Sequence, residues 1–200
     1  MNKQLELVFD FASPNAYLSY RALPPILART NATLVIHPCL LGGIFKATGN
    51  QPPMIAFGDV QGKLAYEQLE TARFVNKHGL SAYKFNPHFP VTTLLLMRGA
   101  IAAERDGYLV AYIEAGLKHM WEDGLKMDDP AIFAQAMTEA GLDGERLLAQ
   151  TAEPEIKQKL IENTQKAVER GAFGIPTFYV GTEMFFGKER LGQVEEELAS

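Results

Sequence analysis

The chain has 200 residues, of which 47% are apolar and 22% are charged, and its net charge is −5. These proportions are ordinary for a globular protein with a buried core. The acidic balance and the lack of a basic stripe argue against a nucleic-acid partner. No apolar run reaches the ~18 residues of a membrane span, and residues 1–11 lack the apolar core of a signal peptide. We therefore predict a cytoplasmic protein that has no membrane partner.

Cysteine usage restricts the chemistry further. Cys39 is the only cysteine, so the chain cannot cycle by itself between a dithiol and a disulfide, and zinc sites built on several cysteines are excluded. The four histidines lack close metal-ligand spacing, and no metal site is predicted. We interpret Cys39 as an inert, buried thiol.

The stretch from Leu5 to Leu18 predicts a strand that runs directly into a helix. Apolar residues alternate through residues 5–11, which is typical of a buried strand. Ser13 then occupies the position of a helix N-cap, and Pro14 fits the first helical position. The free N–H groups and the positive dipole end of such a helix stabilise an anion placed there.

The following residues complete a strand–helix–strand unit. Pro24 and Pro25 are expected to kink or interrupt the first helix, and Thr33–Ile36 predicts a second strand. The unit has the size of a crossover between parallel strands.

The middle of the chain is predicted to be helical, and its end returns to strands. Residues from about 44 to 170 have almost no strand pattern; helices are expected at 63–78, 91–105, 108–121, 130–140, 143–150 and 154–170. Two short strands at 177–180 and 184–186 predict a hairpin, and 189–198 a closing helix. The order indicates one α/β sheet whose halves are separated by a helical insertion.

This order, together with Gly174-Ile175-Pro176-Thr177 before the third strand, resembles the thioredoxin superfamily in its DsbA-like arrangement. The resemblance implies an α/β, thioredoxin-like (DsbA-like) fold with a large all-helical insertion. Residues 1–43 and 171–200 would form a discontinuous thioredoxin-like domain. Residues 44–170 would form the insertion, and its last helix is a candidate member of the thioredoxin-like domain. A DsbA-like oxidoreductase has Cys-x-x-Cys where this chain has Ser13-Pro14-Asn15-Ala16.

A closer resemblance is to the kappa-class glutathione transferases and the 2-hydroxychromene-2-carboxylate isomerases. The matching stretches cover nearly the whole chain in order: Phe9-Asp10-Phe11-Ala12-Ser13-Pro14 with Tyr17-Leu18, Leu40-Leu41-Gly42-Gly43, Gly49-Asn50 with Pro52-Pro53, Lys63 with Tyr66, Arg73 and Gly79, Phe89-Pro90 with Thr93-Leu94, Gly171 to Val180, Phe186-Gly187 and Arg190-Leu191.

The resemblance implies a glutathione-dependent enzyme. The leading activity is isomerisation of 2-hydroxychromene-2-carboxylate to trans-o-hydroxybenzylidenepyruvate in aromatic-compound degradation, by thiolate addition, bond rotation and elimination of glutathione. The first alternative is a kappa-like transferase that conjugates hydrophobic electrophiles. The second alternative, from another class, is a non-catalytic thioredoxin-fold binding protein. The relatives also imply a homodimer.

The resemblance assigns the catalytic role to Ser13. A serine at this place is also an ordinary N-cap, and the two roles are compatible because its oxygen can accept while its hydrogen is donated elsewhere. With no cysteine in the motif, the thiol has to come from bound glutathione, and Ser13 would hold its sulfur as a thiolate. The superfamily match also implies a cis Ile175–Pro176 bond, which would present the Ile175 backbone to the glutathione cysteine.

The remaining glutathione contacts are expected at Asn50, Lys63, Lys188 and Glu189, although each residue taken singly fits a solvated surface position. A cation for the glycine carboxylate and an anion for the γ-glutamyl ammonium would form charge-assisted pairs. Lys188 and Glu189 stand where the family often has a small polar residue and an aspartate, and Glu70 also stands where aspartate is common.

Several aromatic residues are candidates for an apolar pocket that binds a small aromatic substrate. The candidates are Tyr83, Phe85, His88, Phe89 and Trp121. For most of them a place in the core is the favoured interpretation.

Overall fold

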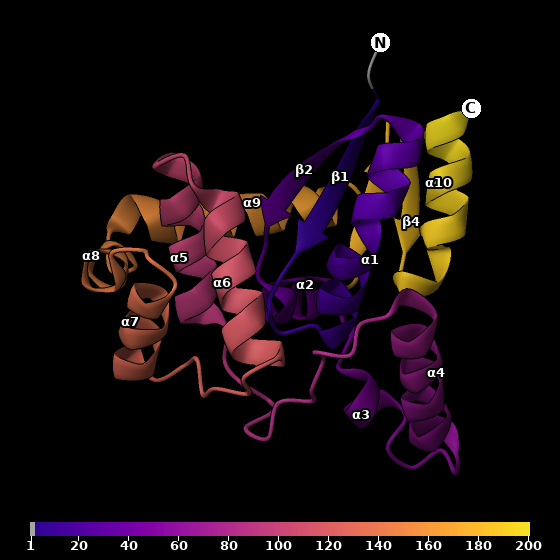
Figure 1. The fold of residues 1–200 in the computed structure, drawn as a ribbon, viewed down its shortest axis with the longest axis horizontal. Helices are drawn as coiled ribbons and strands as arrows, with labels where there is room; N and C mark the ends of the chain where they lie inside the picture. Colours follow the sequence, from indigo (N-terminus) through magenta and orange to yellow (C-terminus); the bar gives the residue numbers. More distant parts are fainter. Residues whose placement is uncertain (1–2) are drawn as a thin grey trace.

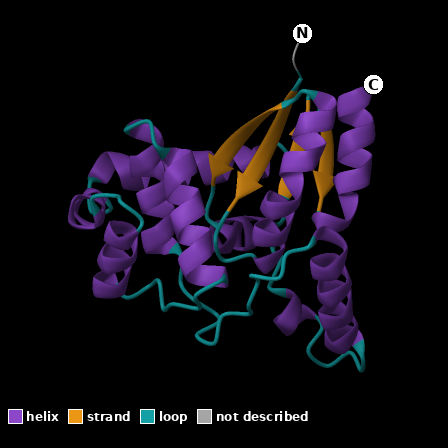
Figure 2. Ribbon diagram, viewed as in Figure 1, coloured by secondary structure: helices purple, strands orange, loops and turns teal. Residues whose placement is uncertain are grey.

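The computed structural model describes residues 3–200 and is built on a mixed four-stranded sheet (Figure 2). Its strands are β1 (Gln4–Phe9), β2 (Thr33–Pro38), β3 (Thr177–Val180) and β4 (Glu183–Phe186), in the order β2-β1-β3-β4. The β1–β2 pair is parallel, whereas β1–β3 and β3–β4 are antiparallel. Strands from the two ends of the chain therefore form one sheet, as predicted.

Helix α1 (Pro14–Thr30) starts where the sequence predicts, with Ser13 as its N-cap and Pro14 in the first turn. The sequence predicts that Pro24 and Pro25 kink or interrupt this helix. The helix is not interrupted, because it continues through both prolines to Thr30. Both prolines are exposed. Their rings therefore face water and leave the buried side of the helix undisturbed, which lowers the cost of a proline inside a helix.

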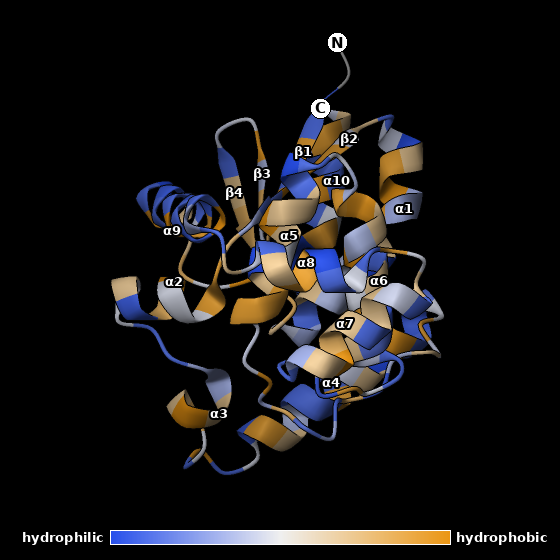
Figure 3. Cartoon of the chain, turned by 90° about the vertical axis from the view of Figure 1, so that its left-hand side faces the viewer, coloured by the Kyte–Doolittle hydropathy of each residue, from blue (hydrophilic) through white to orange (hydrophobic). Residues whose placement is uncertain are grey.

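The sheet lies between two layers of helices. Helices α1 and α10 (Leu191–Ala199) pack side by side over one face, and α9 (Pro154–Glu169) lies across the other with α2 (Leu41–Thr48) at its end (Figures 1 and 3). A short 3-10 turn, η1 (Lys188–Arg190), joins β4 to α10. The arrowheads of β1 and β2 point to the lower end of the sheet, so the loop after β1 and the start of α1 meet α2 there.

The predicted insertion forms a helical region beside the sheet, made of α5 (Leu94–Arg105), α6 (Leu109–Trp121), α7 (Pro130–Glu139) and α8 (Gly144–Gln150). One continuous cluster of buried apolar residues joins this region to the sheet. The Phe11 ring packs so closely on Gly116 that a Cβ there would lie 2.5 Å from it. Helix α9 contacts both β2 and α5, so the division of the chain into two domains stays a prediction.

Helices α3 (Pro53–Ala56) and α4 (Lys63–His78) project from the lower end of the sheet as an arm, which we define as residues 53–78 (Figure 1). Neither helix has a buried residue, and α3 is mostly apolar in the hydropathy colouring of Figure 3. Across residues 3–200, every helix is too short or too polar to cross a membrane.

Candidate functional site

Ser13 lies at the junction of β1, α1 and the loop that precedes β3. Its side-chain oxygen accepts a hydrogen bond from the Ala16 N–H at 3.2 Å, which confirms the predicted N-cap. Its hydroxyl donates to the Ile175 carbonyl at 2.8 Å. The Ile175–Pro176 bond is cis, as predicted. The structure thus brings Ser13, Ile175 and Pro176 together from opposite ends of the chain, with the serine only 5% exposed.

Asp10 holds the loop before Ser13 through hydrogen bonds. It was not among the predicted site residues. Its fully buried carboxylate accepts from the Ala12 N–H at 2.9 Å and from the Leu41 N–H at the start of α2 at 2.7 Å. Burial raises the pKa of Asp10, while hydrogen bonds from Thr93, Ala12 and Leu41 oppose that rise. Asp10 therefore connects the loop before Ser13 to α2. Its position as a charged residue between the apolar Phe9 and Phe11 could have drawn attention to it.

A row of aromatic rings begins one helical turn beyond Ser13. Tyr17 lies 5.4 Å from Tyr83 between ring centroids, and Tyr83 is stacked on Trp121 at 6.1 Å. The Trp121 indole N–H donates to the Phe11 carbonyl at 2.9 Å, which ties the row to the Ser13 loop. Trp121 is fully buried, whereas Phe85, which packs on it, is 58% exposed. The candidates for an aromatic pocket therefore divide between core and surface, and His88 lies exposed beside them.

Tyr17 also takes part in a charged network that sequence reasoning missed. Its hydroxyl donates to Glu122 at 3.0 Å, and Arg21 holds the same carboxylate oxygen at 2.9 Å. Burial, and then the negative charge of Glu122, raise the pKa of Tyr17 to about 12. The phenol therefore stays protonated at neutral pH, with its hydrogen committed to Glu122. The spacing of Tyr17 and Arg21 on α1 gives no sign of a partner that lies about a hundred residues later.

Asn50 lies beside the same loop as the cis proline. Its side-chain amide donates to the Phe173 carbonyl at 2.8 Å, and Phe173 precedes Ile175 by two positions. Lys63 instead lies in the arm, at the start of α4, where its ammonium lies 3.6 Å from Glu67 and 5.0 Å from the Phe57 ring centroid. The structure thus places Asn50 near the Ser13 junction, and the contacts of Lys63 are with other residues of the arm.

Lys188 and Glu189 form an ion pair in η1, directly after β4. The Lys188 side chain is only 2% exposed, and its ammonium lies 5.9 Å from the ring centroid of Phe74 on α4. The Glu189 side chain is 52% exposed. The pair therefore consists of a buried cation and an outer carboxylate at the contact between η1 and the arm.

Cys39 is buried at the end of β2, and its thiol lies 3.4 Å from the Asn163 carbonyl. Burial, reinforced by the Asp10 and Glu104 carboxylates, raises the pKa of Cys39 to about 12. Such a thiol is almost entirely protonated at neutral pH and is a poor nucleophile. Cys39 is therefore a poor candidate for a reactive thiolate.

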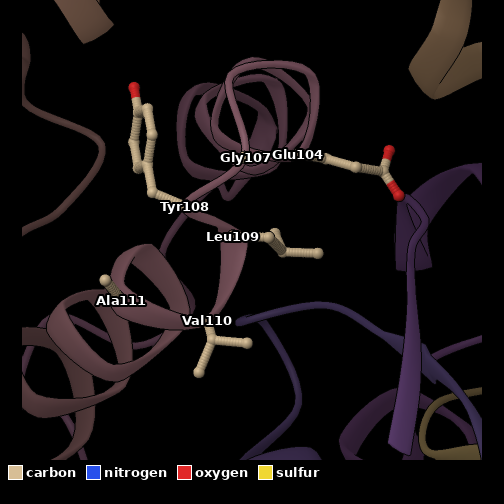
Figure 4. Close-up of a pocket in the computed structure, with 6 residues that line it drawn as sticks. All are labelled: Glu104, Gly107, Tyr108, Leu109, Val110 and Ala111. Atoms are coloured by element: carbon tan, nitrogen blue, oxygen red, sulfur yellow. The ribbon is translucent and has the colours of Figure 1, made fainter.

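Two hollows of the protein lie away from Ser13. The one drawn in Figure 4 lies at the turn between α5 and α6, where the Tyr108 and Glu104 side chains point in different directions. A second, of about 130 Å³, lies between the sheet and α9 beside Cys39 and His37. The lining of the second hollow includes the buried, protonated Cys39, and neither lining includes Ser13.

The strand–helix junction and the cis proline opposite it define a thioredoxin-type site, and the sequence comparison agrees. Residues 4–199 match the model of the DSBA-like thioredoxin domain, and the chain belongs to this family. It is 28% identical to a human glutathione S-transferase kappa 1, covering 94% of this chain and 88% of that protein. It is 26% identical to a Pseudomonas putida 2-hydroxychromene-2-carboxylate isomerase, covering 97% of this chain and 93% of that one.

A solved structure of a 2-hydroxychromene-2-carboxylate isomerase has the same fold. It superposes with a TM-score of 0.83 at 24% identity, covering 96% of this chain and 93% of the other. The predicted fold class and the predicted similarity to these two groups of enzymes are confirmed.

Proposed function

We propose that this protein is a glutathione-dependent enzyme, with isomerisation of 2-hydroxychromene-2-carboxylate to trans-o-hydroxybenzylidenepyruvate as its leading activity. The observation that carries the proposal is the Ser13 hydroxyl at the start of α1, opposite the Ile175 carbonyl. This is a place for stabilising a thiolate in a chain whose only thiol, Cys39, is buried and protonated. Relatives named for both glutathione transfer and this isomerisation support it.

The residues at the junction fit a bound thiol. When bound, glutathione supplies the nucleophilic sulfur. Ser13 would turn its O–H from the Ile175 carbonyl toward that sulfur while its oxygen still accepts from the Ala16 N–H. The positive end of α1 would lower the thiol pKa from ~8.5 into the range of about 3.5–7.5. The Ile175 backbone would pair with the peptide part of the ligand.

The two ends of the ligand would be held by residues near the arm. Lys63 would bind the glycine carboxylate together with Asn50, and Glu189 would face the γ-glutamyl ammonium, with Lys188 acting from behind it. The half-exposed rings beside Trp121, above all Phe85, would contact a small aromatic substrate. In this proposal Ser13 is the catalytic residue. The glutathione site consists of Asn50, Lys63, Ile175, Pro176, Lys188 and Glu189.

We further propose a cytoplasmic homodimer. The lone cysteine fits a compartment where glutathione is kept reduced. The arm exposes a set of large apolar side chains that a second copy could cover: Met54, Ile55, Phe57, Val60, Tyr66 and Leu69.

The test of the reaction is the product formed with reduced glutathione. An isomerase converts 2-hydroxychromene-2-carboxylate to trans-o-hydroxybenzylidenepyruvate with no net loss of glutathione. A kappa-like transferase consumes glutathione and gives a conjugate with a hydrophobic electrophile. S-methylglutathione is the control, because it can bind but offers no thiol; it should raise the melting temperature without supporting turnover. If the protein forms no product and its melting temperature does not respond to millimolar glutathione, the proposal is wrong and a non-catalytic binding protein is favoured.

A further inference from the structure

Four charged side chains meet where the arm touches η1. On α4, Glu70 pairs with Arg73, and on η1 Lys188 pairs with Glu189. Hydrogen bonds from Arg73 and Tyr66 and the nearby charges of Arg73 and Lys188 keep the pKa of Glu70 below its usual value. Both carboxylates in this cluster therefore already have a cation of the protein beside them.

The cation of the second pair cannot readily move away. Lys188 is 2% exposed, and its ammonium faces the Phe74 ring as well as Glu189. A buried lysine keeps its charge only when it is paired. Glu189 is therefore held from the inside by Lys188, while its outer side faces solvent.

A ligand that approaches this cluster meets two carboxylates and two cations, with formal charges that sum to zero. An incoming ammonium is attracted by Glu189 and repelled by Lys188 behind it. A lone carboxylate, or one next to a small polar residue, would attract the same ammonium without this opposition.

We propose that Lys188 is a specificity-determining residue of this subsite: it cancels the charge of Glu189 and makes binding nearly independent of the ligand's α-ammonium. The inference rests on the proposed glutathione site. The site would then accept thiol peptides whose acyl end has no free ammonium, such as glutaryl-cysteinylglycine, about as well as glutathione. Lys188 thus removes the discrimination between ligands that carry an α-ammonium and ligands that lack one.

The experiment is isothermal titration calorimetry of the full chain with glutathione and with glutaryl-cysteinylglycine, which lacks only the ammonium. The wild type should bind the two within about threefold of each other. Lys188→Met keeps an unbranched chain against Phe74 but frees Glu189, so glutathione should become at least tenfold preferred. Lys77→Met removes an exposed lysine from the same helix as Phe74 and should leave the ratio unchanged.

A second variant guards against misfolding of the first. Glu189→Gln leaves the Lys188 charge unbalanced, so the ratio should shift the other way, at least threefold in favour of the ligand without the ammonium. Circular dichroism establishes that each variant is folded. The proposal is overturned if the wild type already prefers glutathione by tenfold or more, or if folded variants keep the wild-type ratio. Failure of both ligands to bind the wild type would instead overturn the glutathione site itself, and this inference with it.

Discussion

The two ends of the candidate site are built differently. At the Ser13 end, Phe9, Phe11 and Tyr17 are almost completely buried, and the Ser13 side chain bonds to backbone groups on both sides. At the other end, the arm has no buried residue. Where it meets η1, each side carries its own ion pair, Glu70–Arg73 on the arm and Lys188–Glu189 on η1. Packing therefore positions the proposed catalytic residue, whereas ion pairs position the side chains proposed to bind one end of the ligand. The substitutions below test this contrast.

The largest expected effect is in the core under the Ser13 loop. Trp121→Ala removes a fully buried ring and the hydrogen bond to the Phe11 carbonyl, and should lower the free energy of unfolding by about 3–5 kcal/mol. Urea unfolding followed by circular dichroism measures the loss. Phe85→Ala, in the same row but exposed, is the control and should cost about 1 kcal/mol or less. Equal losses in the two variants would contradict the assignment of Trp121 to the core.

Asp10→Ala should have the next largest effect. The Ala12 and Leu41 N–H groups, which are partly buried, would lose their acceptor, and the free energy of unfolding should fall by about 1–3 kcal/mol in all. Asp10→Asn keeps one of the two oxygens and should fall between alanine and the wild type. Denaturant midpoints rank the three proteins, and a wild-type midpoint for Asp10→Ala would show that these hydrogen bonds contribute nothing.

Ser13→Ala separates the cap from the proposed catalytic role. Loss of the bond to the Ala16 N–H should cost about 1 kcal/mol of stability. Loss of the hydrogen bond to sulfur, worth about 1.5–3 kcal/mol for a charged partner, should raise the pKa of bound glutathione by roughly one to two units. Thiolate absorbance against pH measures the pKa of bound glutathione. Ser13→Thr should restore both the stability and this pKa. A variant that is less stable but keeps its bound-thiol pKa and turnover would leave Ser13 as a cap alone.

A smaller effect, and one that depends on pH, is expected on the surface of the sheet. Arg170 and His37 both bind the Glu6 carboxylate, at 2.7 Å, and the Arg170 hydrogen bond in particular lowers the pKa of Glu6. A lowered folded-state pKa adds stability above the unfolded value of about 4.3, and this stability is lost as the pH falls through the folded value. Glu6→Gln should therefore cost about 0.5–1 kcal/mol at pH 7 and less near pH 3. A loss of stability in Glu6→Gln that is larger near pH 3 than at pH 7 would contradict this prediction.

The smallest effect on folding is expected in the arm. Leu69→Ser replaces a side chain that is 47% exposed, and in dilute solution the free energy of unfolding should change by about 0.5 kcal/mol or less. If the arm forms the proposed homodimer, the same variant should show a lower molar mass by light scattering at micromolar concentration, because the exposed leucine would be buried there. Unchanged mass of a dimeric protein would place the dimer interface elsewhere.

Local patterns predicted much of this protein. The strand before Ser13, the N-cap and the hairpin near the C-terminus all depend on residues within a few positions of one another, and all are present. The matching stretches spread along the chain indicated the fold and the similarity to the two groups of enzymes. The lone Cys39 excluded an internal disulfide by count alone.

The tertiary structure decided what depends on distant neighbours. Ser13 meets Ile175 across 162 positions, and Trp121 is buried while Phe85 beside it is not. Pro24 and Pro25 are tolerated inside α1 because both lie on its exposed side. Lys188 is buried where η1 packs on α1 and faces Phe74 on α4. The burial of such a charge depends on long-range packing, which has no local pattern.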